Sequence, residues 1–276
     1  KDSKKQDPLD FALWKASKEG EPFWDSPWGK GRPGWHIECS CMSLNHLKCE
    51  TLDIHGGGLD LQFPHHENEV AQAEALTGKP FARYWMHHGL LTINKQKMSK
   101  SLGNFITIAD AVKTYGADAL KLFFLSSHYT SSVDFSEDRM QEMARQREKI
   151  MTFLFRARDF SEGAAPADSP KVFRYRDALV EAMDDDFNTA RAMGGLFDFM
   201  NDMNRVMDQG AEIDRGLIAA ARCVFEEFFF RIFGLELGDH SSEIPADVAK
   251  LLEERAEARA RKDFAESDRL RDLLSG

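Results

Sequence analysis

Residues 51–93, TLDIHGGGLDLQFPHHENEVAQAEALTGKPFARYWMHHGLLTI, contain the pattern that decides the fold. Two short runs, Thr51–His55 and Tyr84–Ile93, are typical of strands, and Pro64–Leu76 between them has a helical pattern. Pro64 suits the first turn of that helix, and Gly78 suits its end. A strand, a helix and a second strand in this order predict a β-α-β unit with a parallel sheet.

The sequence that follows this unit is helical. Ser136 suits the N-cap position of a long helix whose apolar residues recur at helical spacing. Further helical patterns cover residues 171–183, 189–208 and 215–233, and a charge-rich pair covers 247–261 and 263–274. We therefore predict an α/β half followed by an all-α half, with domains at residues 1–135, 136–240 and 241–276.

The composition excludes several classes of protein. With 42% hydrophobic and 30% charged residues among 276, the chain is not disordered. No apolar run approaches the ~20 residues of a membrane span, and Lys1–Lys5 does not begin a signal peptide. Four cysteines form no disulfide framework and indicate a reducing compartment, so we expect a cytoplasmic protein. The net charge of −10 argues against a generally basic surface but allows a local basic patch.

Three side chains could hold a metal ion. His65 and Glu69 lie four residues apart, so one face of the predicted helix presents both, and Cys39 lies upstream. Cysteine, histidine and glutamate are all zinc ligands, and three of them would leave a fourth position open. Two alternatives remain at this point. Glu69 could simply favour the positive end of a helix dipole, or Cys39 and Cys41 together could form a different metal site.

Three glycines, Gly56 to Gly58, follow the first predicted strand, and Asp60 comes directly after the next residue. Glycines let a ligand approach the backbone closely, and Asp60 could accept hydrogen bonds from a ribose. The run lacks the Gly-x-Gly-x-x-Gly spacing of dinucleotide-binding turns. A tight turn without a ligand is therefore an equal alternative.

A compact group of lysines and hydroxyls lies at Lys97–Ser101, which reads KMSKS. It precedes a helix that Thr107 would cap, with Asp110 three residues later. Two cations and two hydroxyls on one loop suit an anion such as a phosphate. The alternative is an exposed basic loop.

Lys97–Ser101 resembles the loop that handles ATP in class I aminoacyl-tRNA synthetases. Four more motifs resemble the cysteinyl-tRNA synthetases of that class: GWHIECS at 34–40, HGGGLD at 55–60, FPHHENE at 63–69 and MDDDFNTA at 183–190. The resemblance covers nearly the whole chain, and the motifs occur in the family's order. The resemblance implies the rear half of a doubly wound Rossmann-type catalytic domain, then a helical bundle of the DALR type, then the start of an anticodon-binding domain.

The family activates L-cysteine with ATP to cysteinyl-adenylate and transfers it to tRNA(Cys). The resemblance therefore implies Zn²⁺ held by Cys39, His65 and Glu69, which selects the cysteine thiolate, and a cysteine pocket lined by Trp35. It implies ATP, with Mg²⁺, as the second substrate. The residues implied to bind ATP are Gly57, Asp60, Ser99, Lys100 and Ser101. Lys97 and Lys100 are implied to act on the ATP phosphates as the catalytic residues.

The sequence departs from the family pattern in its ATP site. The His-x-Gly-His motif is absent, since His87–Leu90 has the wrong order, and so is a further zinc-binding cysteine upstream of it. A strand-rich C-terminal tail is also missing. We therefore expect a fragment that lacks one zinc ligand and cannot form cysteinyl-adenylate alone.

A basic stretch in this acidic chain is a candidate surface for tRNA. Residues 139–158 contain six lysines or arginines and two glutamates, a net charge of +4. Within it we expect Arg145 and Arg147 to contact phosphates, although a solvated helix face is the alternative. We expect a monomer that does not bind a membrane. Two other functions remain open: the cysteine ligase of mycothiol synthesis, and a non-catalytic helical module that binds tRNA.

Overall fold

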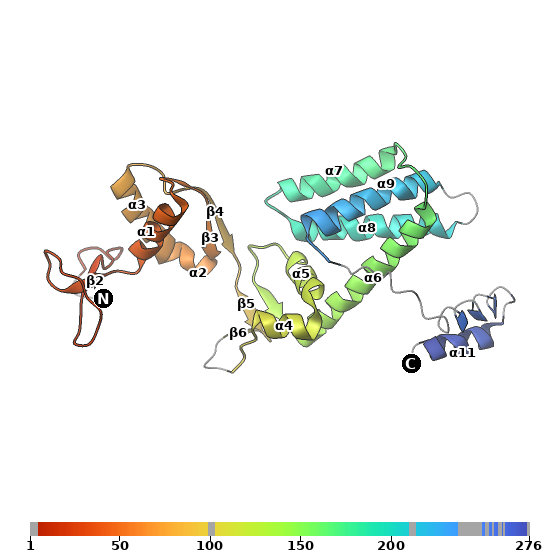
Figure 1. The fold of residues 1–276 in the computed structure, drawn as a ribbon, viewed down its shortest axis with the longest axis horizontal. Helices are drawn as coiled ribbons and strands as arrows, with labels where there is room; N and C mark the ends of the chain where they lie inside the picture. The colour runs from red at the N-terminus through yellow and green to blue at the C-terminus, as the bar shows by residue number, and fades with distance from the viewer. Residues whose placement is uncertain are drawn as a thin grey trace. The chain divides into compact units, whose positions relative to one another are not determined.

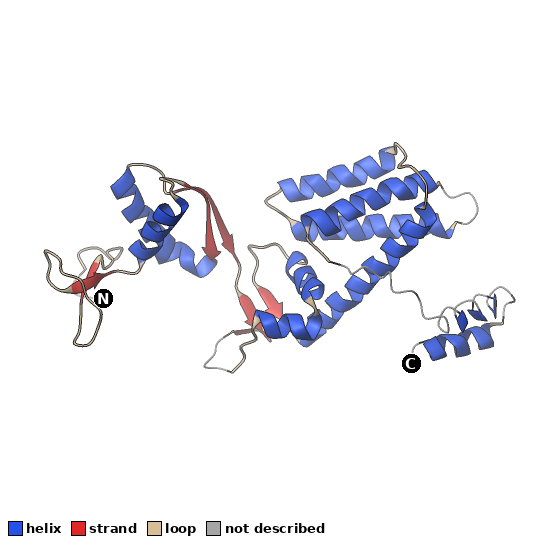
Figure 2. Cartoon of the chain, in the orientation of Figure 1, coloured by secondary structure: helices blue, strands red, loops and turns tan. Residues whose placement is uncertain are grey.

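The computed structural model describes residues 5–98, 103–209 and 214–236, together with 250–251, 254–255, 257–258, 261 and 263–274. The chain forms two compact units, Lys1–Leu235 and Glu236–Gly276. In the first unit, three small groups of strands lie among helices, and the later part is helical (Figures 1 and 2). This order confirms the predicted α/β half followed by an all-α half.

The first unit begins with an antiparallel pair of strands, β1 (Trp14–Ala16) and β2 (Gly31–Pro33). Helix α1 (His36–Leu47) follows directly and packs against helix α3 (Glu67–Thr77). The strand pair β1–β2 therefore comes just before α1, the helix that carries Cys39 of the candidate metal site.

The predicted β-α-β unit is present. Strand β3 (Leu52–Gly58) pairs in parallel with β4 (Ala82–His88), from Leu52 opposite Ala82 to Gly58 opposite His88. Between them lie α2 (Leu59–Leu61), the π-helical turn η1 (Gln62–His66) and α3. Gly78 ends α3 in the left-handed conformation with φ 67°, as its sequence position predicts. A core of Leu52, Ala73 and Phe81 joins the strands to α3.

The bounds of both strands differ from the prediction. The first was expected to end at His55, but it continues through the glycines, which pair with residues of β4. The second was expected to run unbroken to Ile93, yet β4 ends at His88 and β5 (Leu91–Ile93) pairs elsewhere. The break lies at Gly89, where a Cβ would come within 2.1 Å of the Ser131 carbonyl oxygen. This close approach requires glycine and is a tertiary contact.

The helix was expected to include Pro64 in its first turn. This start is wrong, because Pro64 lies in the irregular turn η1 that precedes the regular helix. Phe63 has extended backbone angles (φ −134°, ψ 132°) inside η1, and the regular helix α3 begins at Glu67. Because the irregular turn immediately precedes α3, it places His65 and His66, both buried, at the start of that helix.

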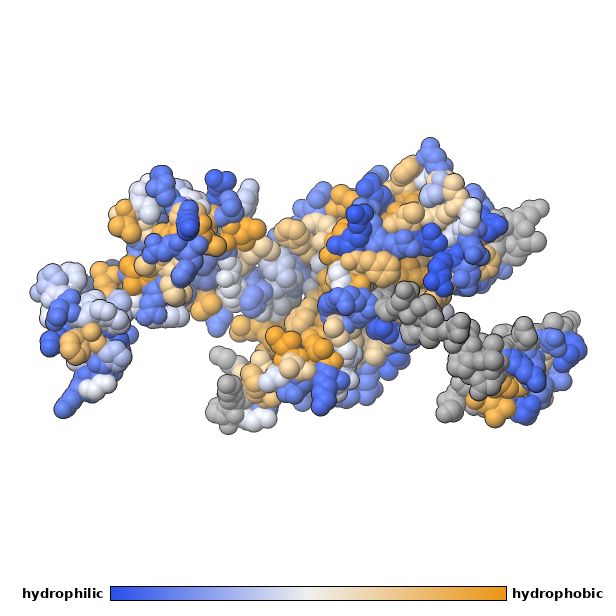
Figure 3. Space-filling model, in the orientation of Figure 1, coloured by the Kyte–Doolittle hydropathy of each residue, from blue (hydrophilic) through white to orange (hydrophobic). Residues whose placement is uncertain are grey.

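A second sheet has the strand order β6-β5-β7, where β6 is Gln96–Lys97 and β7 is Val133–Phe135. Helices α4 (Ile108–Tyr115) and α5 (Ala117–Leu125) precede β7. Thr107 caps α4 as predicted, since its hydroxyl accepts from the Asp110 backbone N–H at 3.0 Å and donates to the Asp110 carboxylate at 2.6 Å. Figure 3 shows apolar side chains on the surface here; Ile108 on α4 is 79% exposed.

The helical part begins where Ser136 caps α6 (Glu137–Ser161). It continues with α7 (Pro170–Asp184), α8 (Thr189–Asp208), α9 (Arg215–Glu226) and the π-helical turn η3 (Glu227–Ile232). These bounds match the helical patterns of the sequence within a few residues. In the second unit, α11 spans Phe264–Leu274. None of the described helices is both long and apolar enough to cross a membrane.

Aromatic rings form the centre of the helical part. Phe199 on α8 is fully buried and stacks on Tyr175 of α7, with ring centroids 4.3 Å apart, and on Phe225 of α9 at 4.6 Å. The Tyr175 hydroxyl donates to Asp202 at 2.7 Å, and burial with this bond raises the pKa of Tyr175 to about 12. These contacts hold α7, α8 and α9 together.

We expect Phe199→Ala to lower the free energy of unfolding by about 3–5 kcal/mol, because it removes a buried ring and leaves a cavity between three helices. Chemical denaturation followed by circular dichroism measures the change. Phe173→Ala is the matched control, since Phe173 on α7 is 49% exposed. Equal losses in the two variants would contradict the role of Phe199 as the central core residue.

Candidate functional site

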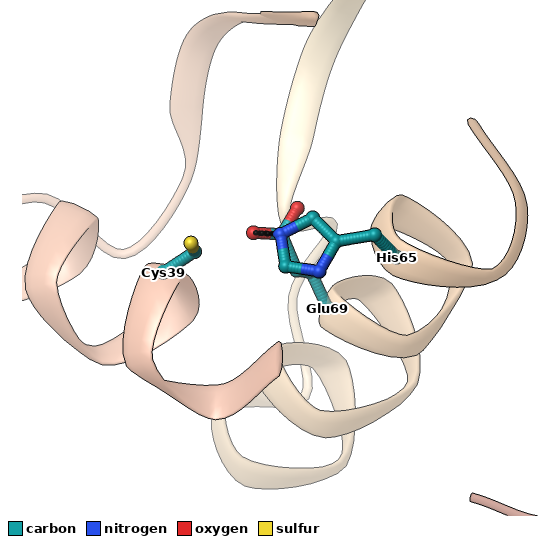
Figure 4. A group of neighbouring side chains, drawn as sticks. All are labelled: Cys39, His65 and Glu69. Atoms are coloured by element: carbon teal, nitrogen blue, oxygen red, sulfur yellow. Dashed lines mark ion pairs between the residues drawn. The ribbon is translucent and has the colours of Figure 1, made fainter. Parts of the chain in front are cut away.

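Three elements bring the predicted metal ligands together. Cys39 lies on α1, His65 on η1 and Glu69 on α3, and one ligand atom of each lies within 4.8 Å of the others. Figure 4 shows the Cys39 thiol facing the ring of His65 and the carboxylate of Glu69. His65 and Glu69 meet because they are four residues apart, and Cys39 reaches them because α1 packs on α3. The three side chains therefore form one cluster of metal-ligand type.

The carboxylate of Glu69 is the buried centre of this cluster. The side chain is 1% exposed, and its Oε2 lies 2.7 Å from His55 Nε2. Its Oε1 lies 3.3 Å from His65 Nε2, within ion-pair distance, yet it makes no hydrogen bond. A short distance alone does not make a hydrogen bond, which also requires the correct angles. A buried carboxylate oxygen without a hydrogen bond normally carries a cost, which a metal ion would remove.

The ring of His65 is held from two sides. Its Nδ1 lies 2.7 Å from Nδ1 of His36, so one of the two nitrogens donates and the other accepts. The indole of Trp35 stacks on the ring with centroids 3.9 Å apart and an angle of 19° between planes. Burial, followed by the nearby His65, lowers the pKa of His36, which favours its neutral form. Because Nδ1 is engaged, the Nε2 nitrogen of His65 faces Glu69.

The surroundings of Cys39 disfavour the ionised form of its thiol. Burial raises its pKa first, and the negative charge of Glu69 raises it further. Zinc or another cation would offset these effects by stabilising the thiolate. Cys41, the alternative ligand, is exposed instead, and the Asn45 amide donates to its sulfur at 3.2 Å. Among the described residues, Cys39 clusters with His65 and Glu69 and not with Cys41.

A second group of three possible ligands, His55, His66 and Glu69, shares the carboxylate of Glu69. His66 Nδ1 lies 2.8 Å from His87 Nε2, and burial lowers the pKa of His66. Sequence reasoning singled out neither His36 nor His55. His36 precedes Cys39 by one helical turn, so helical spacing could have identified it. The contact of His55 depends on how β3 faces α3, which has no signal in the sequence.

The glycines predicted to face ATP have a packing role in the chain itself. A Cβ on Gly57 would lie 3.0 Å from the ring of His66, and one on Gly56 would lie 2.8 Å from the Met86 carbonyl oxygen. The run is part of strand β3, so the tight turn considered from the sequence is wrong. Asp60 lies on the short helix α2 and is exposed. Neither observation tests whether Gly57 and Asp60 bind ATP.

The lysine-rich loop begins in the described part of the chain and continues beyond it. Lys97 is the last residue of β6 and pairs with Thr92 of β5. Ser99, Lys100 and Ser101 lie outside the described residues, so their implied roles stay predictions.

The two arginines expected to contact tRNA differ in their surroundings. Arg145 is exposed on α6. Arg147 is 26% exposed, with Nε 3.5 Å from Asp118 on α5 and Nη1 2.9 Å from Glu148. The Asp118 carboxylate is itself buried, so Arg147 neutralises a charge inside the chain. Arg145 is therefore the stronger candidate for an external partner.

A β-α-β unit that carries the candidate metal site, followed by a helical bundle, is the arrangement of a class I aminoacyl-tRNA synthetase. A solved structure supports this fold: the LeuRS of Agrobacterium radiobacter K84, in a ternary complex with tRNA and LeuAMS, aligns with a TM-score of 0.62. The alignment covers 78% of this chain and 33% of that one at 14% identity, so it bears on the fold alone.

The chain belongs to the family described as the tRNA synthetases class I (C) catalytic domain, whose model matches residues 1–145. The model of the DALR domain matches residues 178–238. Similar curated proteins are the cysteine–tRNA ligases of Thermodesulfovibrio yellowstonii and Geobacter sulfurreducens, each 48% identical over 99% of this chain. That of Bacillus cereus strain G9842 is 47% identical over 99%. The chain spans about 60% of the length of these relatives.

Proposed function

We propose that the chain is part of a cysteine–tRNA ligase, which activates L-cysteine with ATP and transfers the cysteinyl group to tRNA(Cys). The observation that carries the proposal is the cluster of Cys39, His65 and Glu69, which unites the three predicted zinc ligands from three separate elements. The named relatives support the same function. We place the enzyme in the cytoplasm, where free thiols such as those of its four cysteines persist.

The residues of the cluster fit a zinc ion. They offer one sulfur, one imidazole nitrogen and one carboxylate oxygen, a donor set that zinc accepts, and Glu69 Oε1 is buried with no hydrogen bond to lose. When bound, zinc would supply a soft Lewis acid that favours the thiolate of cysteine over the hydroxyl of serine. Such discrimination matters because a pocket alone gains only about 1–3 kcal/mol per small group.

The surrounding residues would bind and orient the substrates. Trp35 is 51% exposed, so the face of its indole opposite His65 can line a pocket for the cysteine side chain. In this proposal, Gly57, Asp60, Ser99 and Ser101 bind ATP. Lys97 and Lys100 stabilise the charge on its phosphates, together with Mg²⁺. Catalysis then consists of positioning and charge stabilisation, and no covalent bond to the protein forms.

The test is ATP–pyrophosphate exchange by the natural gene product, with L-cysteine and L-serine compared. Exchange that depends on cysteine and is lost with serine supports the proposal. Exchange that proceeds equally with both amino acids, or none with cysteine, contradicts it. Transfer of cysteine to tRNA rather than to glucosaminyl-inositol separates a tRNA ligase from the mycothiol-pathway ligase. A chain that binds tRNA without any exchange would be a non-catalytic module.

We expect Arg145→Ala to weaken tRNA binding and to lower the slope of log K against log salt by about 1, the amount for one phosphate contact. The free energy of unfolding should stay unchanged, because Arg145 is exposed. Filter binding at several salt concentrations measures the effect. Arg205→Ala on α8, where Arg205 is also exposed, is the control. An unchanged salt slope in Arg145→Ala would remove this residue from the tRNA surface.

A further inference from the structure

The Lys97–Ser101 loop is entered through a two-residue hairpin turn that carries unfavourable backbone angles. Ile93 pairs with Gln96 and Thr92 with Lys97, so Asn94 and Lys95 alone connect β5 to β6. Both have positive φ, 51° and 61°, as a type I′ turn requires. Asparagine tolerates this region, but at the second position glycine is the usual residue, and a lysine there is strained.

One carboxylate from a distant part of the chain holds this turn. Oδ1 of Asp134 on β7 accepts a hydrogen bond from the Lys95 backbone N–H at 2.6 Å and another from the Thr92 hydroxyl at 2.6 Å. Asp134 lies directly opposite Thr92 in the parallel pairing of β5 with β7. The two bonds to a charged acceptor lower the pKa of Asp134, which therefore carries a negative charge at neutral pH.

We infer that Asp134 is a positioning residue for ATP activation, because it fixes the hairpin whose last residue, Lys97, begins the loop that handles ATP. The inference rests on the proposed function. Asp134 holds both sides of the hairpin: Lys95 in the turn, and Thr92, which pairs with Lys97. A catalytic group displaced by about 1 Å can lose on the order of 100-fold in rate. Because the backbone of Lys95 is strained, the hairpin should shift to relieve that strain once the carboxylate is removed.

The first test compares Asp134→Ala with Asp134→Asn in the natural gene product. Asp134→Ala should lower kcat of ATP–pyrophosphate exchange by roughly 10- to 100-fold, with the KM for cysteine changed less than about twofold, since the cysteine site lies on other elements. Asp134→Asn should recover most of the loss, because its amide oxygen can accept both bonds. Asp138→Ala is the control: Asp138 is an exposed carboxylate at the start of α6.

Two further measurements separate positioning from a general loss of stability. Hydrogen exchange of the Lys95 amide should accelerate in Asp134→Ala and remain slow in Asp134→Asn. Adding Lys95→Gly to Asp134→Ala should restore part of kcat, since glycine adopts a positive φ without strain. A structural defect elsewhere in the fold would not respond to a glycine in this turn.

The outcomes distinguish the inference from the proposed function. If the wild-type protein shows no cysteine-dependent exchange, the proposed function fails, and the inference fails with it. If the wild type is active and Asp134→Ala matches it, the inference alone is wrong. The inference is also wrong if Asp134→Ala loses activity while the Lys95 amide keeps its slow exchange. Loss of activity, faster exchange of that amide and rescue by Lys95→Gly together support it.

Discussion

Lys100→Ala is expected to lower cysteine-dependent ATP–pyrophosphate exchange by about 100- to 1,000-fold. This is the typical cost of removing one well-placed donor that stabilises negative charge in a transition state. The expectation follows from the KMSKS string at 97–101, in which the two lysines are implied to contact the ATP phosphates. Zinc content should not change, because the proposed zinc ligands lie on α1, η1 and α3. Metal analysis and exchange kinetics on the same preparation measure both quantities.

Lys113→Ala provides the matched control for this variant. Lys113 lies in the last turn of α4, where a lysine favours the negative end of the helix, and it has no implied role with ATP. Its exchange rate should match that of the wild type. Normal exchange in Lys100→Ala would refute the assignment of the loop to ATP, and loss of zinc in that variant would show that it damages the fold.

The sequence predicted the elements well where the pattern is local. Gly78 marks the end of a helix through a cap residue that acts within a few positions, and that helix is present, although Pro64 lies in the irregular turn before it. The break between β4 and β5 could not be predicted in this way. It depends on Gly89, which lies against the backbone of Ser131, more than forty residues later. Likewise, the glycines of β3 suggested a turn, but their pairing with β4 places them inside the strand.

The candidate site was predictable for similar reasons. His65 and Glu69 share a helix face by their spacing. Cys39 was a candidate third ligand upstream, and the family resemblance favoured this set over a site of Cys39 and Cys41. The contact of His55 with the Glu69 carboxylate required the packing of β3 against α3, and no local pattern encodes it. Arg147 belongs to a basic stretch, yet its guanidinium pairs with the buried Asp118, and its contact with tRNA stays a prediction. A count of charges along the chain cannot tell an internal partner from an external one.

Glu69→Gln is expected to weaken zinc binding by about 100-fold or more, beyond the range measured when only an outer partner of a ligand is removed. The substitution keeps the size of the side chain and lets an amide oxygen accept from His55, so the packing of α3 against α1 should survive. It removes the negative charge and replaces one carboxylate oxygen by an NH₂ group, which is not a zinc ligand. Competition with a chromophoric chelator measures the affinity.

Two features make this variant decisive. Glu67→Gln is the matched control, because Glu67 lies two residues earlier on the same helix and is exposed, so its zinc affinity should equal that of the wild type. The second feature is the sign of the effect on Cys39. The charge of Glu69 raises the pKa of that thiol, so its removal makes the thiolate easier to form and by itself would strengthen zinc binding. A large loss of affinity therefore measures the lost carboxylate ligand. Unchanged affinity in Glu69→Gln would exclude Glu69 from the metal site, whatever its burial.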